Sequence, residues 1–172
     1  MLNAMLAHEA IKFSNEKHAG QVRKGSGDPY ITHPIAVSYI VAAFKRSKAL
    51  VQLLCAAILH DTLEDTETTY DELERKFGTL VASLVLELTD DKDEIARIGK
   101  LEYQKQKVLN YTSYGLVLKL CDRLHNVSDS PTAKTIRDTL ELMDHLVANR
   151  KLTRPQSALV EAIRTVCLEA QR

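Results

Sequence analysis

The amino-acid sequence predicts one all-α domain over residues 1–172, a bundle of about seven or eight helices. Apolar residues recur every three or four positions through most of the chain, which is typical of helices that face a core. No segment alternates between polar and apolar residues for six positions, so no strand is expected. A chain of this length can bury a core without disulfides or structural metals.

Seven apolar stripes predict the helices in order. They occupy residues 2–13, 35–44, 50–58, 80–88, 116–124, 136–146 and 159–167. Glycine-rich residues 25–29 and polar residues 89–93 predict breaks between helices. The predicted helix starts are a capping box at Thr69 and Glu72, a second at Thr153 and Gln156, and a cap at Ser130 before Pro131.

The composition narrows the classes of protein. The chain has 23 Lys and Arg and 23 Asp and Glu, so its net charge is zero. A protein that coats nucleic acid usually has a basic excess, so no nucleic-acid partner is expected, although a small anionic ligand fits. The three cysteines, Cys55, Cys121 and Cys167, stand far apart in apolar helices, which predicts buried thiols. No membrane-spanning run and no leader peptide is recognised, which predicts a cytoplasmic protein.

The strongest candidate site follows the third stripe. Residues 51–59 are apolar almost all round, so this helix is expected to be buried. His60, Asp61, Glu64 and Asp65 follow directly, and a four-residue spacing places His60 and Glu64 on one helical face. Ionisable groups at the end of a buried helix are costly unless a cation or a partner meets them.

Two other segments repeat this combination of a polar residue with an apolar helix. His33 stands just before a predicted helix, and Asp122 lies within a strongly apolar one, four residues before Asn126. With His60 and Asp61 they would supply two imidazoles and two carboxylates. Mixed nitrogen and oxygen ligands suit manganese, iron or a similar divalent ion better than magnesium.

The motif His…His-Asp…Asp, at His33, His60, Asp61 and Asp122, resembles that of the HD superfamily of metal phosphohydrolases. The flanking blocks resemble the hydrolase domain of RelA/SpoT homologues. They keep their order and are HAGQVRK at 18–24, PYITHP at 29–34, AILHDTLEDT at 57–66, FG at 77–78 and KLCDRLHN at 119–126.

This resemblance implies an all-α HD fold and removal of the 3′-pyrophosphate from ppGpp or pppGpp, which gives GDP or GTP and pyrophosphate. It also implies a role for each matching residue. The implied roles are manganese ligation by His33, His60, Asp61 and Asp122, activation of water by Glu64 and Asp65, and nucleotide binding by Arg23, Lys24 and Asn126.

The chain ends near the close of the resembling domain, so a stand-alone alarmone hydrolase, like the animal SpoT homologue, is expected. Two departures from the family pattern stand beside Asp122. Cys121 replaces a common alanine, and residues 127–130 differ from those of the long enzymes, which leaves the nucleotide contacts after Asn126 undefined.

Two alternatives stay open. The same metal site could act on another nucleotide such as NADPH, or the protein could be a non-catalytic ppGpp sensor. The presence of both Glu64 and Asp65 counts against a sensor, since binding alone needs no proton-transfer pair. The sequence also leaves the oligomeric state open, a homodimer included.

Three further polar features receive simple structural expectations. His18, late in the first helix, is expected to cap a carbonyl. Residues 90–94 are expected to form a polar loop. For Arg123 the sequence does not separate a carboxylate partner from a phosphate contact.

Overall fold

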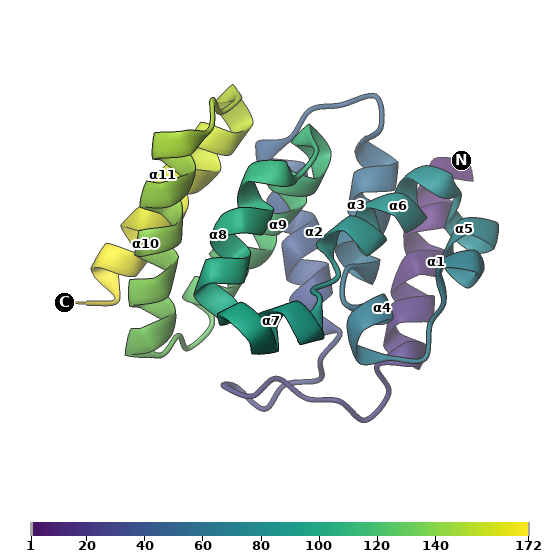
Figure 1. Ribbon diagram of the computed structural model, residues 1–172. Coiled ribbons are helices and arrows are strands. Elements are labelled where there is room, and N and C mark those ends of the chain that lie inside the picture. The colour runs from purple at the N-terminus through teal and green to yellow at the C-terminus, as the bar shows by residue number, and fades with distance from the viewer. Residues whose placement is uncertain (1, 172) are drawn as a thin grey trace. The chain divides into compact units, whose positions relative to one another are not determined.

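The computed structural model describes the backbone of residues 2–171 and the side chains of residues 5–171. Within that part of the chain it contains eleven helices and no strand, which confirms the all-α prediction (Figure 1). The predicted number of helices, seven or eight, was too low. No stripe had marked α4 (Thr62–Asp65), α5 (Tyr70–Phe77), α7 (Lys92–Ile98) or α8 (Lys100–Asn110). Each of these buries at most two residues, so its apolar stripe is short or missing.

The chain forms two compact units, Met1–Thr89 and Asp90–Arg172. In the first, α3 (Leu50–Leu59) is the central helix, because α1 (Leu2–Lys17), α2 (Thr32–Phe44) and α6 (Thr79–Leu88) all pack against it. Six of the ten α3 residues are buried, Leu53 and Leu59 completely. The prediction of a buried helix directly before His60 is therefore confirmed.

The segment between α1 and α2 is a loop with its own backbone pairing. Val22 and Pro29 form an isolated antiparallel bridge. The backbone N–H of Arg23 donates to the carbonyl of Asp28 over 2.8 Å, and that of Tyr30 donates to the carbonyl of Gln21 over 3.0 Å. In Figure 1 this loop is the purple stretch that leaves the end of α1. Its pairing holds the predicted basic pair at its tip.

The second unit contains α7, α8, α9 (Ser113–Ser128), α10 (Ala133–Asn149) and α11 (Arg154–Glu169). Helix α9 packs against α11, and α10 packs against both α8 and α11. Figure 1 shows α10 and α11 side by side. The residues at the centre of this packing are completely or almost completely buried, among them Leu116, Leu120, Met143, Leu146, Leu159 and Ile163.

Two of the three predicted helix starts are confirmed. The Thr69 hydroxyl accepts from the backbone N–H of Glu72, and Thr153 with Gln156 forms a complete capping box. The third was wrong, because α10 begins at Ala133 and Thr132 caps it by accepting from the N–H of Thr135. Ser130 instead has a φ of 51°, outside the extended conformation that an N-cap residue adopts.

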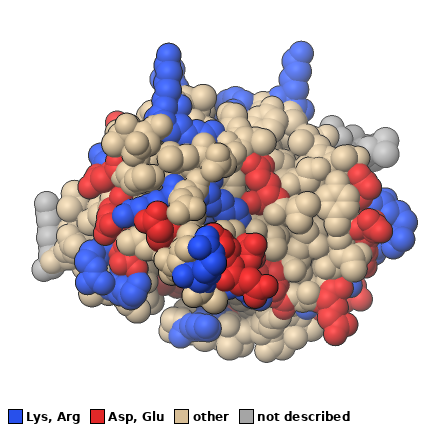
Figure 2. All heavy atoms as spheres, viewed as in Figure 1, with Lys and Arg blue, Asp and Glu red and all other residues tan. Residues whose placement is uncertain are grey.

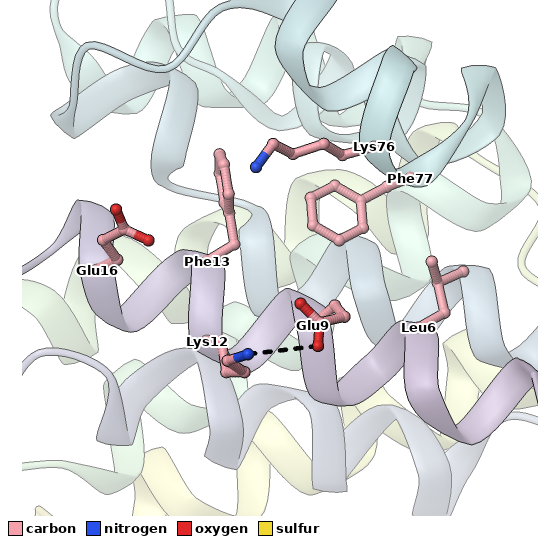
Figure 3. A pocket seen from close by; sticks show the side chains of 7 residues that line it. All are labelled: Leu6, Glu9, Lys12, Phe13, Glu16, Lys76 and Phe77. Carbon is pink, nitrogen blue, oxygen red and sulfur yellow. Dashed lines mark ion pairs between the residues drawn. The ribbon is translucent and has the colours of Figure 1, made fainter.

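A cleft of about 280 Å³ opens between α1 and α5 of the first unit (Figure 3). The Phe13 and Phe77 rings meet edge to face there, and Lys76 lies over the Phe13 ring. The cleft is lined by Leu6, Glu9, Lys12, Phe13, Glu16, Lys76 and Phe77. None of them is a predicted site residue, so the site described below is distinct from this cleft. Among the described residues no helix is both long and apolar enough to cross a membrane.

Candidate metal centre

Two buried histidines from different helices meet in the first unit. His33 is the second residue of α2 and is 1% exposed, and His60 directly follows α3 and is 4% exposed. Their Nε2 atoms are 3.3 Å apart, and the ring planes are inclined at 61°. The two imidazoles predicted as ligands therefore meet edge to face, and the Nε2 atom of each ring points toward that of the other.

The backbone determines which nitrogen of His60 faces its partner. His60 Nδ1 lies 2.8 Å from the carbonyl oxygen of Ala57. A carbonyl can only accept, so Nδ1 carries the proton and donates it. In the neutral ring, Nε2 then keeps its lone pair, which is the atom a metal ligand needs.

Asp61 stands at the N-cap position of α4, yet its side chain does not cap the helix. Its Oδ2 atom lies 3.0 Å from Nε2 of His60 and 3.7 Å from Nε2 of His33. The same oxygen accepts a short hydrogen bond from the hydroxyl of Tyr30. The carboxylate is thus turned toward the two imidazoles and away from the helix start.

These three atoms fit a divalent cation. Ligand atoms about 2.1 Å from a cation lie about 3.0 Å apart at right angles and about 3.4 Å apart at tetrahedral angles. Two of the observed separations, 3.0 and 3.3 Å, lie in that range, and the third, 3.7 Å, is slightly longer. Lone-pair atoms converging in a buried place repel one another unless a proton or a cation lies among them. His33, His60 and Asp61 therefore have both the donor types and the spacing of a metal site.

The two carboxylates predicted to activate water follow within one turn. Glu64 is half-buried and Asp65 is exposed, and the backbone N–H groups of both donate to the carbonyl of Asp61. The hydroxyls of Thr62 and Thr66 bond the carbonyls of Leu59 and Thr62. This short helix is therefore closely tied to the end of α3, which carries His60.

His18 and Gln21 lie beside residues 61–65, and the sequence had not predicted a role for them in the site. His18 is buried, and its Nδ1 lies 2.8 Å from Oε1 of Gln21, so it does not cap a carbonyl through that nitrogen as expected. Gln21 Nε2 donates to the carbonyl of Asp65 over 3.1 Å. Both residues stand in the matching block at 18–24, but nothing in the sequence predicts their contact with each other or with Asp65, so only the fold reveals this link.

Tyr30 is the third residue that the sequence left without a defined role. Its ring lies 4.6 Å from that of His18 and 5.8 Å from that of His33, measured between centroids. The Arg23 guanidinium lies 6.0 Å from the same ring, whereas the neighbouring Lys24 is exposed at the tip of the loop. The predicted nucleotide-binding pair is therefore carried by the loop that ends at Tyr30.

The second unit holds the remaining predicted residues. Asp122 is 6% exposed on α9, and both of its oxygens have donors from the same helix. Asn126 Nδ2 donates to Oδ1 over 2.6 Å, and Lys119 Nζ lies 3.1 Å from Oδ2. Burial lowers the pKa of Lys119, but the charges of Asp122, Tyr111 and Asp90 raise it by more, so it lies above the usual value.

Arg123 and Asp90 have structural partners. The Arg123 guanidinium donates to Oε1 of Gln104 and to the hydroxyl of Thr139, and thereby joins α8, α9 and α10. Both of these partners are neutral, so neither is the carboxylate that was one of the two alternatives for Arg123. Asp90 was expected in a polar loop, but its side chain is 7% exposed and pairs with Lys107 over 3.0 Å.

Neither sign of charge dominates the surface in view (Figure 2). Figure 2 shows Lys and Arg interspersed with Asp and Glu on that face, with wide uncharged areas between them. This distribution agrees with the net charge of zero. An anionic ligand would have to be recognised by a few local groups rather than by a broad basic field.

Comparison with known proteins identifies the family of this chain. A sequence profile of the HD domain family matches residues 10–152, a range that extends across both units. The mouse guanosine-3′,5′-bis(diphosphate) 3′-pyrophosphohydrolase MESH1 is 46% identical over 125 residues, which cover 70% of this chain and 67% of that protein. The Aquifex aeolicus protein of the same enzyme name is 36% identical over 148 residues, but this chain covers only 20% of its length.

Solved structures give the same relationship. The structure described as a metazoan orthologue of SpoT that hydrolyses ppGpp is 27% identical, with a TM-score of 0.75 over 93% of this chain and 94% of that one. A Listeria monocytogenes protein with 20% identity and a TM-score of 0.65 shares the fold. The chain therefore belongs to the HD domain family, among the relatives of the animal SpoT homologue.

Proposed function

We propose that this protein is a manganese-dependent (p)ppGpp 3′-pyrophosphohydrolase. The observation that carries the proposal is the convergence of His33, His60 and Asp61 one turn before Glu64 and Asp65. The substrate follows from the relatives, because MESH1 proteins at 38–46% identity bear the name of this activity.

The proposed ligand set is His33, His60, Asp61 and Asp122. The first three are supported by their geometry, and Asp122 is supported by its place in the HD motif. We further propose that residues 1–172 function as one HD domain, since the family profile runs through both units. Two imidazoles with carboxylates favour manganese over magnesium.

The proposed reaction is hydrolysis at the 3′-pyrophosphate. A bound divalent cation makes water more acidic and polarises a phosphoryl oxygen. Glu64 or Asp65 accepts the proton of the attacking water, whose oxygen bonds to the phosphorus attached to the 3′ oxygen. The 3′ oxygen leaves with the nucleoside and takes up a proton, and pyrophosphate is released. The exposure of Asp65 lets the accepted proton pass to solvent.

Arg23, Lys24 and Asn126 are the proposed nucleotide-binding residues. Arg23 and Lys24 are cations on the loop that ends at Tyr30, so they are suited to negatively charged or aromatic parts of the substrate. Asn126 donates to Asp122 and would bind the nucleotide beside that ligand. Three free, buried cysteines agree with a reducing compartment, and we propose the cytoplasm.

Replacing Glu64 with Gln and Asp65 with Asn tests the catalytic roles. The double variant removes the proton acceptors but none of the proposed ligands, so turnover of ppGpp should fall at least about 100-fold while manganese affinity stays within about threefold. Calorimetric titration with manganese chloride and a pyrophosphate-release assay measure the two quantities. The matched control is Glu67→Gln, an exposed residue of the same segment, which should behave as wild type. Loss of manganese binding in the double variant would mean that these carboxylates are ligands.

A substrate panel tests the nucleotide. The wild-type protein is incubated with ppGpp, NADPH and deoxynucleoside triphosphates, each with and without manganese. The proposal expects pyrophosphate from ppGpp at a kcat/KM well above that for the others. Preferential release of phosphate from NADPH would assign the site to that nucleotide, and tight ppGpp binding without turnover would identify a sensor.

A further inference from the structure

Tyr30 is in contact with a proposed metal ligand and with the basic loop at the same time. Its hydroxyl donates to Oδ2 of Asp61, the oxygen nearest the two imidazoles. Its ring is in contact with those of His18 and His33, and the Arg23 guanidinium lies 6.0 Å from it. Tyr30 is half-buried, so these contacts surround most of the side chain.

The backbone of Tyr30 closes the loop that carries Arg23 and Lys24. The N–H of Tyr30 donates to the carbonyl of Gln21 over 3.0 Å, next to the Val22–Pro29 bridge. Any displacement of Tyr30 therefore moves the base of this loop. Beyond that base the backbone N–H of Arg23 donates to the carbonyl of Asp28.

Gln21 links the same loop a second time to residues 61–65, which include the proposed catalytic carboxylates. Its Nε2 donates to the carbonyl of Asp65 over 3.1 Å, and its Oε1 accepts from Nδ1 of His18 over 2.8 Å. The two sides of the loop base thus reach the two ends of residues 61–65, Tyr30 at Asp61 and Gln21 at Asp65. A movement of the loop base would therefore also move residues 61–65.

We propose that Tyr30 is a positioning residue that couples the basic loop to the metal site. The proposal rests on the proposed function, because it takes Asp61 to be a metal ligand. Through its hydroxyl, Tyr30 orients the carboxylate of Asp61 toward the cation. Hydrogen bonds to the ligands of a metal commonly change its affinity by 10- to 100-fold. Linkage is reciprocal, so a cation that fixes Asp61 also fixes Tyr30 and the loop base.

The variant Tyr30→Phe isolates the hydroxyl, since it keeps the ring that packs on His18 and His33. Manganese affinity should fall about 10-fold or more, measured by calorimetric titration of the metal-free protein with manganese chloride. Arg23 and Lys24 supply a second readout, because trypsin cleaves after both. Manganese should slow cleavage at these two sites in the wild type, and this protection should be lost in the variant at equal metal occupancy.

Tyr39→Phe is the matched control, since it removes a hydroxyl from α2 at a side chain that is 73% exposed. It should leave metal affinity and tryptic protection unchanged. Circular dichroism of each variant establishes that it folds. Equal affinity and equal protection in Tyr30→Phe and wild type would overturn the proposal, as would a wild type that binds no divalent cation. A wild type that binds manganese but does not hydrolyse ppGpp would overturn the proposed substrate and leave both readouts for Tyr30 decisive.

Discussion

Asp61 stands at an N-cap position, but its side chain does not make the capping hydrogen bond. Aspartate at an N-cap normally accepts from the first backbone N–H groups of the helix, which stabilises it by about 1 kcal/mol. Here the carboxylate faces His60, His33 and Tyr30, and α4 begins without that bond. The Asp61 side chain thus leaves the start of α4 uncapped and faces the two imidazoles, a loss of local stability that is common at functional sites.

The buried thiols lead to a prediction about chemical reactivity. Burial raises the pKa of Cys55 to about 11, and burial also raises the pKa of Cys121 and of Cys167. Because the thiolate is the reactive form, none of the three should react with a disulfide reagent at pH 8 in the folded protein, and all three should react in urea. Rapid labelling of one thiol in the folded state would contradict this burial.

The same shift predicts how stability depends on pH. Cys55 holds its proton in the folded state up to about pH 11 but loses it near pH 9 when unfolded. The unfolded state therefore binds fewer protons between these values, and the free energy of unfolding should fall as the pH rises from 9 to 11. Urea unfolding of wild type and Cys55→Ala, compared across this range, should show a smaller fall in the variant.

Among the helices, those with a long buried apolar face could be predicted from the sequence, and those with a short one could not. Helices α3 and α9 bury six and nine residues, and their stripes were plain in the sequence. Helix α7 buries none of its residues, and α4 buries only Thr62, so neither produced a periodic pattern. The start of α10 was misplaced because two hydroxyl residues, Ser130 and Thr132, were both suitable caps in the sequence.

Arg150 binds the end of α8, a long-range contact that no local sequence pattern predicts. Its guanidinium donates to the carbonyls of Val108, Leu109 and Tyr111, which lie about forty positions earlier in the chain and have lost their helical partners. Arg150→Met keeps the aliphatic stem and should lower the free energy of unfolding by about 1.5–3 kcal/mol, measured by urea denaturation.

The control for Arg150 is Arg137→Met on α10, whose side chain is 69% exposed and lies 3.7 Å from Asp138. A change below about 0.5 kcal/mol is expected there. Equal destabilisation of both variants would mean that the loss of any arginine, rather than of these three bonds, causes the effect.

For the whole molecule, the sequence identified the residues that carry the proposed chemistry but not those that arrange them. His60, Asp61, Glu64 and Asp65 are neighbours in the chain, so a single helical pattern placed them together. The approach of His33 to His60 required the packing of α2 on α3, which a motif suggests but cannot measure. Tyr30, His18 and Gln21 meet the site through a loop with no regular period, so their contacts could not be predicted from the sequence.

The convergence of His33, His60 and Asp61 is proposed to serve metal-dependent release of pyrophosphate from ppGpp. The most direct measurement incubates the metal-free wild-type protein with ppGpp, adds manganese chloride, and quantifies GDP and pyrophosphate by anion-exchange chromatography. The two products should appear in equal amounts with manganese and be absent with a chelator. Calorimetric binding of manganese without any release of pyrophosphate from ppGpp would contradict the account.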